Sequence, residues 1–542
     1  MLRRFAVVVL ALAVAGCTKI SANGTPESRN PWTQPGVLRF AENAEPHSLN
    51  VLLDSQTVTN DIDSFAFQYT VRYDDKANPV PDAVARVPTV ENGDVAKDGM
   101  TITYRLRRDL KWSDGRPVTC EDLKFTWQAV MNPKNNVVTT DGYKDIGSIT
   151  WTDPHVCVVH MKKLYAPFLQ QLWSVNGNAP ILPAHLLAKY PDINNVPYDS
   201  QPVTSGPFMV TKWQHGVEVE LKPNPYWPGP KPKLSEVIFK TMPDENTMLA
   251  QLQSHEIDLL ARGSAHLWPQ VQAITGVAPV AISSFLFSHL DFNLDRPILK
   301  DRSVRLAIAE AINKREIIDK LLHGLGDEAW TDQSPRLSWA YDASLKHYTY
   351  DPASANKLLE ADGWKLGPNG VRWKNGRELA LTISATAESS VGAQMETLIQ
   401  ADLQRIGIAL TVKNYPTPVF FENDANGIIQ GGKYDIALFS WSSAADPDDS
   451  AIYSCDNFSP HGQNNMHWCN RRATAAMNDA LQTIDRARRK ADYRIVQEEL
   501  LKDVPTVIIY FWREIYAYNT DLKGFSPSPV ISPFYDTESY SI

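Results

Sequence analysis

The chain has 542 residues, of which 43% are hydrophobic and 10% aromatic, and its formal net charge is −9. A chain of this length and apolar content usually folds into two or more lobes, each with a sizeable core. The acidic balance argues against a nucleic-acid partner, because such a partner favours a concentrated basic face.

The N-terminal segment reads MLRRFAVVVLALAVAGC, in which two arginines precede an apolar run from Phe5 to Ala15. The run is too short to span a bilayer and has the length of a signal-peptide hydrophobic region. Its small last residues lead directly to Cys17, and this end resembles a bacterial lipobox. The resemblance implies a lipoprotein signal peptide over residues 1–16, a lipid on Cys17 and a lipidated tether over residues 17–35. An uncleaved anchor with a chance cysteine is the alternative.

Export would place the other cysteines in an oxidising compartment. Four remain, Cys120, Cys157, Cys455 and Cys469, and four cysteines allow three pairings. Cys455 and Cys469 flank a loop rich in Gly, Pro and Asn, which favours a local bridge there and leaves Cys120 to pair with Cys157. Free buried thiols are the alternative, and neither pair has the C-x-x-C spacing of a zinc or redox site.

Strand and helix patterns alternate irregularly through the first half of the chain, beginning with a short strand after Gly36. Residues 101–131 predict a strand, a turn at Asp114-Gly115 and a helix. Thr119 is the candidate N-cap of this helix, and Asp122 follows three residues later, close to a capping box.

Residues 206–227 predict a hairpin, because Val217, Val219 and Leu221 alternate with charged residues. Further strands are predicted within residues 155–163, 235–242 and 257–261, and a helix within residues 244–256.

The longer helices are predicted in the second half. Residues 301–324 predict one helix, since Val304, Ile308, Ala311 and Ile312 share a face and Gly324 ends the pattern. The remaining patterns are a short helix in 351–364, an amphipathic helix in 389–407, a strand in 408–415, one or two helices in 473–503 and a strand pair in 505–519. Together these patterns indicate an α/β chain with mixed sheets.

Signatures of common enzymes are missing from the sequence, which contains no G-x-S-x-G elbow, P-loop or H-E-x-x-H motif. His461 and His467 lie close together but have no convincing third metal ligand. Asp446, Asp448 and Asp449 lack the glycine and distal glutamate of an EF-hand loop, and Asp-Pro-Asp suits a turn or helix cap. We therefore expect no catalytic residue, no metal and no cofactor.

The order of several segments, from about Gly36 to Pro529, resembles one protein family. Residues 106–127 match its strand, Ser-Asp-Gly turn and Thr-x-Glu-Asp helix start, and residues 205–227 match its Gly-Pro-aromatic strand and Asn-x-x-Trp hairpin end. Four more matches follow in the family's order, at residues 237–260, 290–326, 350–364 and 461–470. The family is the dipeptide/oligopeptide-binding family (family 5) of extracellular solute-binding proteins, which serve bacterial ABC importers.

The resemblance implies a fold and a set of domain boundaries. The fold would be α/β and two-lobed, of the class II or Venus-flytrap type of periplasmic binding protein, with an additional domain on the first lobe. Lobe I would comprise residues 30–75, 196–290 and 510–542, the additional domain residues 76–195, and lobe II residues 291–509.

The implied function is capture of a peptide or other small solute between the lobes and its delivery to an ABC permease in the membrane. The protein would be a monomer on the periplasmic or extracytoplasmic face, anchored to the membrane by the lipid on Cys17, and it would not be an enzyme. One alternative is an exported, lipid-anchored hydrolase with an interlobe cleft. Another is a sensor or chaperone of the same fold that takes no part in transport.

Peptide binders of this family usually carry Trp-x-x-Asp-x-x-Asp-Pro at the second-lobe side of the ligand site. This chain reads WSSAADP from Trp441, one residue shorter, so that Ser443 or Ala444 stands in place of the first Asp and Asp446 matches the second. The first Asp pairs with a peptide's α-ammonium, so its loss weakens the expectation of ordinary peptide capture. The expected wall is the Trp441 ring with hydrogen bonds from Ser442 and Ser443. An inward-turned Asp446 is an alternative anchor, and position alone adds Asn43, Phe287, His289 and Asn464.

Overall fold

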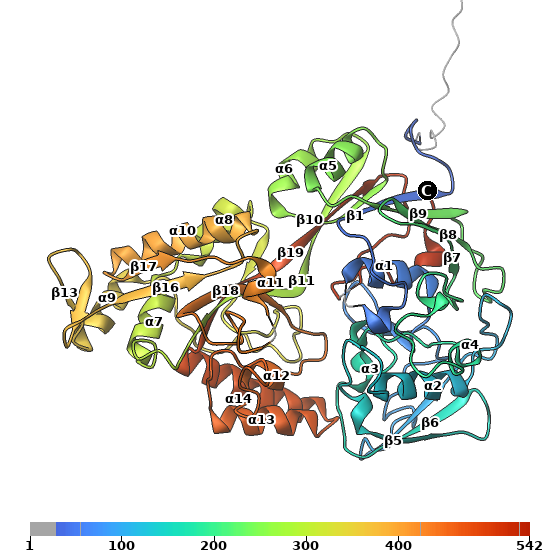
Figure 1. The fold of residues 1–542 in the computed structure, drawn as a ribbon, viewed down its shortest axis with the longest axis horizontal. Helices are drawn as coiled ribbons and strands as arrows, with labels where there is room; N and C mark the ends of the chain where they lie inside the picture. The colour runs from blue at the N-terminus through green and yellow to red at the C-terminus, as the bar shows by residue number, and fades with distance from the viewer. Residues whose placement is uncertain (1–28, 55, 423, 531) are drawn as a thin grey trace, which may run out of the picture.

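The computed structural model describes residues 29–54, 56–422, 424–530 and 532–542 (Figure 1). The predicted signal peptide and the predicted lipid on Cys17 lie outside the described residues. Asn30 Nδ2 donates to the carbonyl of Gly276 at 3.2 Å, and the hydroxyl of Thr33 donates to Asp521 at 2.5 Å. The last residues of the expected tether are therefore fixed against the fold. Of the helices in the described ranges, none is long and apolar enough to cross a membrane.

Within the described residues, one mixed sheet of 11 strands runs through both halves of the molecule. β11 and β19 are its long central strands, with 16 and 14 residues, and they pair antiparallel. Figure 1 shows these two strands passing from one half of the molecule to the other. The order is β17 (Ala409–Val412), β16 (Ala380–Ser384), β18 (Ile436–Ser442), β11 (Val277–Phe292), β19 (Thr506–Asn519), β10 (Leu259–Gly263), β1 (Val37–Glu42), β9 (Glu236–Thr241), β8 (Glu218–Pro223) and β7 (Phe208–Gln214), and β12 (Gly326–Glu328) pairs with β19 beside this path.

We call the first lobe the part built around the hydrophobic cluster that contains Leu38, Phe65, Tyr104 and Trp173. This cluster continues without a break from the strands of the main sheet into the separate three-stranded sheet β4-β6-β5. The further elements of this lobe are α1 (Thr57–Ala66), β2 (Val71–Tyr73), β3 (Pro79–Pro81), β4 (Thr101–Arg105), α2 (Cys120–Met131), β5 (Ile146–Thr150), β6 (Val156–Met161), α3 (Phe168–Gln171), α4 (Ala184–Leu187), α5 (Glu245–Gln253) and α6 (Trp268–Gln272).

We call the second lobe the part built around the cluster that contains Ile308, Ile383 and Ile399. Its helices and small strands are α7 (Arg302–Ala311), α8 (Lys314–Leu321), α9 (Pro352–Ala361), β13 (Lys365–Leu366), β14 (Arg372–Lys374), β15 (Arg377–Glu378), α10 (Ser390–Arg405), α11 (Thr417–Phe420), α12 (Ser450–Tyr453), α13 (Arg471–Leu481) and α14 (Arg486–Asp503).

Helices cover both faces of the sheet in the second lobe. This coverage explains the apolar sequence of β19 in that lobe. Val507 and Ile509 belong to the core shared with α7–α10, whereas Ile508 packs in the cluster shared with α13 and α14. Successive side chains of a strand point to opposite faces, so a strand covered on both sides reads as a continuous apolar run.

Several predicted elements are confirmed. The hairpin is present as β7 and β8, which pair antiparallel. Helix α2 begins after Thr119, whose N–H donates to Asp122 Oδ2 at 2.8 Å in a capping box. The predicted bridges also form, because Cys120 is disulfide-bonded to Cys157 and Cys455 to Cys469.

Two predicted elements are wrong. The single helix expected over residues 301–324 is divided into α7 and α8, because the side chain of Asn313 accepts from the N–H of Glu316 and starts a new helix. The strand pair expected at the C-terminal end is one strand, β19. Its polar middle, Arg513 and Glu514, is not a turn but lies half-buried where the strand passes between the two lobes.

Candidate functional site

A cavity of about 340 Å³ lies between the two lobes, at the end of β18. Trp441 stands opposite Phe287 in the antiparallel register of β18 and β11, and both residues line the cavity. The chain then continues from Ser442 to Asp449 along the wall. The complete lining is Asp141, Tyr165, Pro167, Gln170, Gln171, Asn176, Ser284, Phe285, Leu286, Phe287, Asp332, Trp441, Ser442, Ser443, Ala444, Ala445, Asp446, Pro447, Asp448, Asp449, Ala451, Ile452, Glu514, Pro529 and Val530. The site thus combines surfaces of both lobes.

The lobes touch along one edge of this cavity, where the tip of the α13–α14 pair reaches the first lobe (Figure 1). The N–H of Ala166 donates to the carbonyl of Leu481 at 3.1 Å, and Gln482 Nε2 donates to the carbonyl of Leu164 at 3.0 Å. The N–H of Asp446 donates to Gln170 Oε1 at 2.5 Å across the same boundary. The structure therefore has the two lobes in contact, with the cavity between them.

The predicted wall residues of the WSSAADP segment come together at the cavity. The N–H of Ser443 donates to the carbonyl of Phe285 at 2.9 Å, which continues the pairing of β18 with β11 beyond Ser442. The buried hydroxyl oxygen of Ser443 has no hydrogen-bond partner among the described residues. A ligand polar group could satisfy this oxygen, and Trp441 with Phe287 would supply the apolar wall.

Asp446 lines the cavity, but its carboxylate is engaged by a cation of its own lobe. The guanidinium of Arg489 forms a very short ion pair with Asp446 Oδ1 and lies 5.1 Å from the centre of the Trp339 ring. Arg489 has a side chain only 3% exposed, so removing Asp446 from it would leave a buried charge. Asp446 therefore positions the wall, and its charge is balanced before any ligand arrives.

The structure places three other predicted residues outside the cavity wall. His289 is buried, with Nδ1 3.1 Å from Asp291 Oδ1 and its ring against Phe439. The amide of Asn464 is buried, and its Nδ2 donates to the carbonyls of Ser454 and Trp468. Asn43 is exposed after β1. Sequence position alone does not show that His289 and Asn464 are buried and pack within the second lobe.

A pair of aspartates, Asp332 and Asp449, lines the cavity and was not singled out as a ligand site from the sequence. Gln333 Nε2 donates to both oxygens of Asp449, at 3.0 and 2.9 Å, and lies 3.3 Å from Asp332 Oδ2. Burial raises the pKa of Asp332 to about 6. Burial and then the neighbouring charge of Asp332 raise the pKa of Asp449 well above its usual value. Residues 332 and 449 are 117 positions apart, so no local sequence motif predicts that they form a pair.

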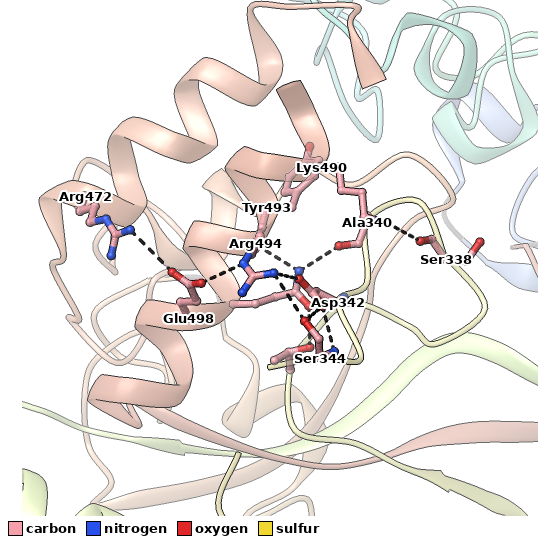
Figure 2. A network of polar contacts seen from close by, with 11 residues as sticks. Ser338, Ala340, Asp342, Ser344, Arg472, Lys490, Tyr493, Arg494 and Glu498 are labelled. Atoms are coloured by element: carbon pink, nitrogen blue, oxygen red, sulfur yellow. Dashed lines mark hydrogen bonds and ion pairs between the residues drawn. The ribbon is translucent and has the colours of Figure 1, made fainter. Parts of the chain in front are cut away.

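The loop that follows Asp332 is fixed to α14 by a polar network (Figure 2). Arg494 Nη1 donates to Asp342 Oδ2 at 2.6 Å. Gln497 Nε2 donates to the carbonyl of Ala340 at 2.9 Å from the buried side of the helix. These contacts fix the loop to the helix that also carries Arg489.

The sequence profile of the family described as "Bacterial extracellular solute-binding proteins, family 5 Middle" matches residues 79–462. The chain belongs to this family. It is accordingly a solute-binding protein that delivers a peptide or another solute to an ABC transporter. The predicted family and the predicted two-lobed α/β fold class are confirmed.

Relatives extend over nearly the whole chain. The oligopeptide-binding protein AppA of Bacillus subtilis (strain 168) is 23% identical over 532 residues, which cover 96% of this chain and 95% of that protein. The oligopeptide-binding protein OppA of Lactococcus lactis subsp. cremoris (strain SK11) is 30% identical over 466 residues, which cover 76% and 74%. The crystal structure of NikZ from Campylobacter jejuni in complex with Ni(L-His) is similar with a TM-score of 0.79 and 26% identity, over 94% of this chain and 100% of that one.

This solute-binding protein also contains a Ser–His–Asp arrangement outside the cavity. His467 Nε2 lies 3.1 Å from Ser459 Oγ, and His467 Nδ1 lies 2.7 Å from Asp295 Oδ2. The same Nε2 lies 3.0 Å from the carbonyl oxygen of Ser459. Ser459 is only 5% exposed, and its loop is closed by the Cys455–Cys469 disulfide. The cluster fixes the loop between Cys455 and Cys469 and lies outside the interlobe cavity.

Proposed function

We propose that the chain is an exported, lipid-anchored solute-binding protein that encloses one small solute in the interlobe cavity and presents it to an ABC permease. The observation that carries the proposal is the cavity itself, whose wall is made by both lobes at once. Its volume of about 340 Å³ is at the lower end of the range for small-molecule sites, which is roughly 300–1,000 Å³. The family's shared fold and the names of the relatives support transport of a peptide or another small solute.

Capture would work by a shift between open and closed forms. A ligand that contacts Trp441 in the second lobe and Gln170 in the first binds the closed form better than the open one. If about 1% of the ligand-free protein were closed, the ligand would have to bind the closed form about 5.5 kcal/mol more favourably than the open form to make about 99% of it closed. The two hydrogen bonds between the lobes, at Leu481 and Gln482, lie at the edge of the cavity and would add to the stability of the closed form.

The N-terminal sequence supports the lipid anchor. A lipid on Cys17 would confine the protein to the membrane surface and raise its effective concentration at the permease. Replacement of Cys17 by serine tests this part separately, since the variant should leave the membrane fraction while its solute affinity stays unchanged. Retention of the variant in the membrane would contradict lipidation at this residue.

The test of capture is mass spectrometry of the protein purified natively from its own cells, followed by re-addition of the identified solute in a thermal shift assay. We expect one small solute per chain and an affinity at least about ten-fold weaker in Trp441→Ala. If Trp441→Ala folds normally and binds the solute as tightly as the wild type, the cavity is not the binding site. Turnover of the solute by the wild type would favour the hydrolase alternative, and a gene neighbourhood without permease and ATPase genes would favour the sensor or chaperone.

A further inference from the structure

The wall of the interlobe cavity carries charge of only one sign. Of the described residues that line it, six bear carboxyl groups and none is a lysine, an arginine or a histidine. The six are Asp141, Asp332, Asp446, Asp448, Asp449 and Glu514. A cavity of this composition opposes an anionic solute, because a like charge enclosed with these carboxyl groups is repelled in a medium of low dielectric.

Three of the six carboxyl groups already have a cation nearby. Asp141 accepts from Lys144 Nζ at 2.7 Å, and Asp446 is held by Arg489. Glu514 Oε2 lies 4.0 Å from Arg262 Nε and accepts from the hydroxyl of Tyr516 at 2.7 Å. The cations lie outside the cavity wall, and Arg262 is shared between Glu514 and the closer Asp61.

The other three, Asp332, Asp448 and Asp449, belong to none of the ion pairs within the described part of the chain, although the charge of Lys144 lowers the pKa of Asp448 against burial. Asp448 is turned to its own helix start, where it accepts from the N–H and hydroxyl of Ser450. Asp332 and Asp449 instead share the single amide nitrogen of Gln333. The pair therefore has one amide donor for two carboxyl groups, which also form a hydrogen bond with each other and so share a proton.

One oxygen of this pair is unsatisfied. Asp332 is 1% exposed, and its Oδ1 has no hydrogen-bond partner among the described residues. A buried oxygen without a donor is costly, and buried polar groups are almost always hydrogen-bonded in native structures. An unpartnered carboxyl oxygen in the wall of a ligand cavity points to a donor that the ligand supplies.

The rest of the wall indicates an organic ligand instead of a bare metal ion. Trp441, Phe287, Ile452, Pro529 and Val530 line the same cavity. A metal ion at the aspartate pair would leave these apolar side chains without contact, whereas a carbon skeleton attached to an ammonium group would cover them.

We infer that the cavity takes a small organic cation whose ammonium group is bound by the Asp332–Asp449 pair. The inference rests on the proposed function and names the class of its cargo. The ammonium hydrogens supply donors to Asp332 Oδ1 and to Asp449, and the positive charge takes the place of a proton shared by the pair. That proton is released to solvent when the cation binds, so the charge of the pair and the ligand stays balanced.

The inference is tested with two series of probes of similar size whose members differ in charge. The cationic probes are trialanine amide and 1,4-diaminobutane. N-acetyl-trialanine amide and 1,4-butanediol are the neutral counterparts, N-acetyl-trialanine and succinate the anionic ones, and calcium chloride serves as a metal probe. Each is titrated into the full-length protein by calorimetry, in buffers of different ionisation enthalpy so that proton release is measured as well.

We expect at least one of the two cations to bind at least about ten-fold more tightly than its neutral counterpart and to release protons. Asp332→Asn should weaken that binding by at least about ten-fold, whereas Asp319→Asn, which removes an exposed carboxylate of α8, should leave it unchanged. Tighter binding of a neutral, anionic or calcium probe, an unchanged affinity in Asp332→Asn, or no binding of either cation would overturn the inference. Native mass spectrometry separates this failure from failure of the proposed function, since a retained neutral or anionic solute lost in Trp441→Ala would leave capture intact.

Discussion

Replacing Asp332 by asparagine should stabilise the ligand-free protein near neutral pH, although the change removes a residue of the proposed site. Burial raises the pKa of the Asp332 carboxyl from 3.8 to about 6. Between these values the folded carboxyl keeps a proton that the unfolded chain has lost, so the wild type loses stability as the pH rises through this window. About two pH units at about 1.4 kcal/mol each correspond to about 3 kcal/mol. Asparagine has no such cost, because it does not ionise.

The neighbours of Asp332 act against burial but do not outweigh it. Hydrogen bonds with Asp449 and Gln333 and the ring of His289 lower the pKa of Asp332, whereas the charge of Asp332 raises the pKa of Asp449. An asparagine amide at position 332 could donate to Asp449, which would relieve that carboxylate as well.

The assay is urea unfolding of ligand-free wild type and Asp332→Asn at about pH 4 and about pH 7.5. We expect nearly equal free energies of unfolding at the lower pH and an advantage of about 3 kcal/mol for the variant at the higher pH. Asp319→Asn, with its exposed charge, should change stability by less than about 0.5 kcal/mol at either pH. If Asp332→Asn is less stable than the wild type at pH 7.5, Asp332 is satisfied as a carboxylate in the ligand-free protein and the reasoning fails.

Three further perturbations test other contacts. Arg489→Ala leaves the Asp446 carboxylate uncompensated, so we expect a loss of about 3–5 kcal/mol in urea unfolding, and a loss under about 1 kcal/mol would show that the ion pair is dispensable. Serine at Cys120 and Cys157 opens a loop of 37 residues, which should lower the free energy of unfolding by about 4 kcal/mol, and an unchanged urea midpoint would contradict this. Ile484, in the connection between α13 and α14, packs against the first-lobe cluster. Ile484→Asp should therefore enlarge the radius of gyration measured by X-ray scattering and weaken solute binding. An unchanged radius of gyration would mean that this edge does not hold the lobes together.

Local sequence signals predicted local structure well. Thr119 with Asp122 predicts the start of α2, and the alternation around Val219 predicts the β7–β8 hairpin. Both signals depend only on residues close together in the chain, so the sequence alone is enough to recognise them. The division of α7 from α8 was missed because Asn313 is a weak helix breaker inside a continuous apolar pattern, and its N–H finds a partner in Asp402, far along the chain.

The candidate site was predicted only where one segment carries it. Trp441 and Ser443 follow a single strand, so the resemblance to a family motif placed them together, and the structure has both in the cavity wall. Asp332 and Gln170 come from distant segments, and only the packing of the lobes brings them to the same cavity. The fate of the Asp446 charge likewise depends on Arg489 in α14, which no spacing rule connects with the WSSAADP segment.

The central claim is that one solute sits between the lobes at this cavity, and a crystal structure of the natively purified protein with its retained solute tests it most directly. We expect density for the solute against the Trp441 ring and within hydrogen-bond distance of Gln170, with a nitrogen of the solute at Asp332 Oδ1. Density for the solute at any other surface, or contact with residues of one lobe alone, would contradict it.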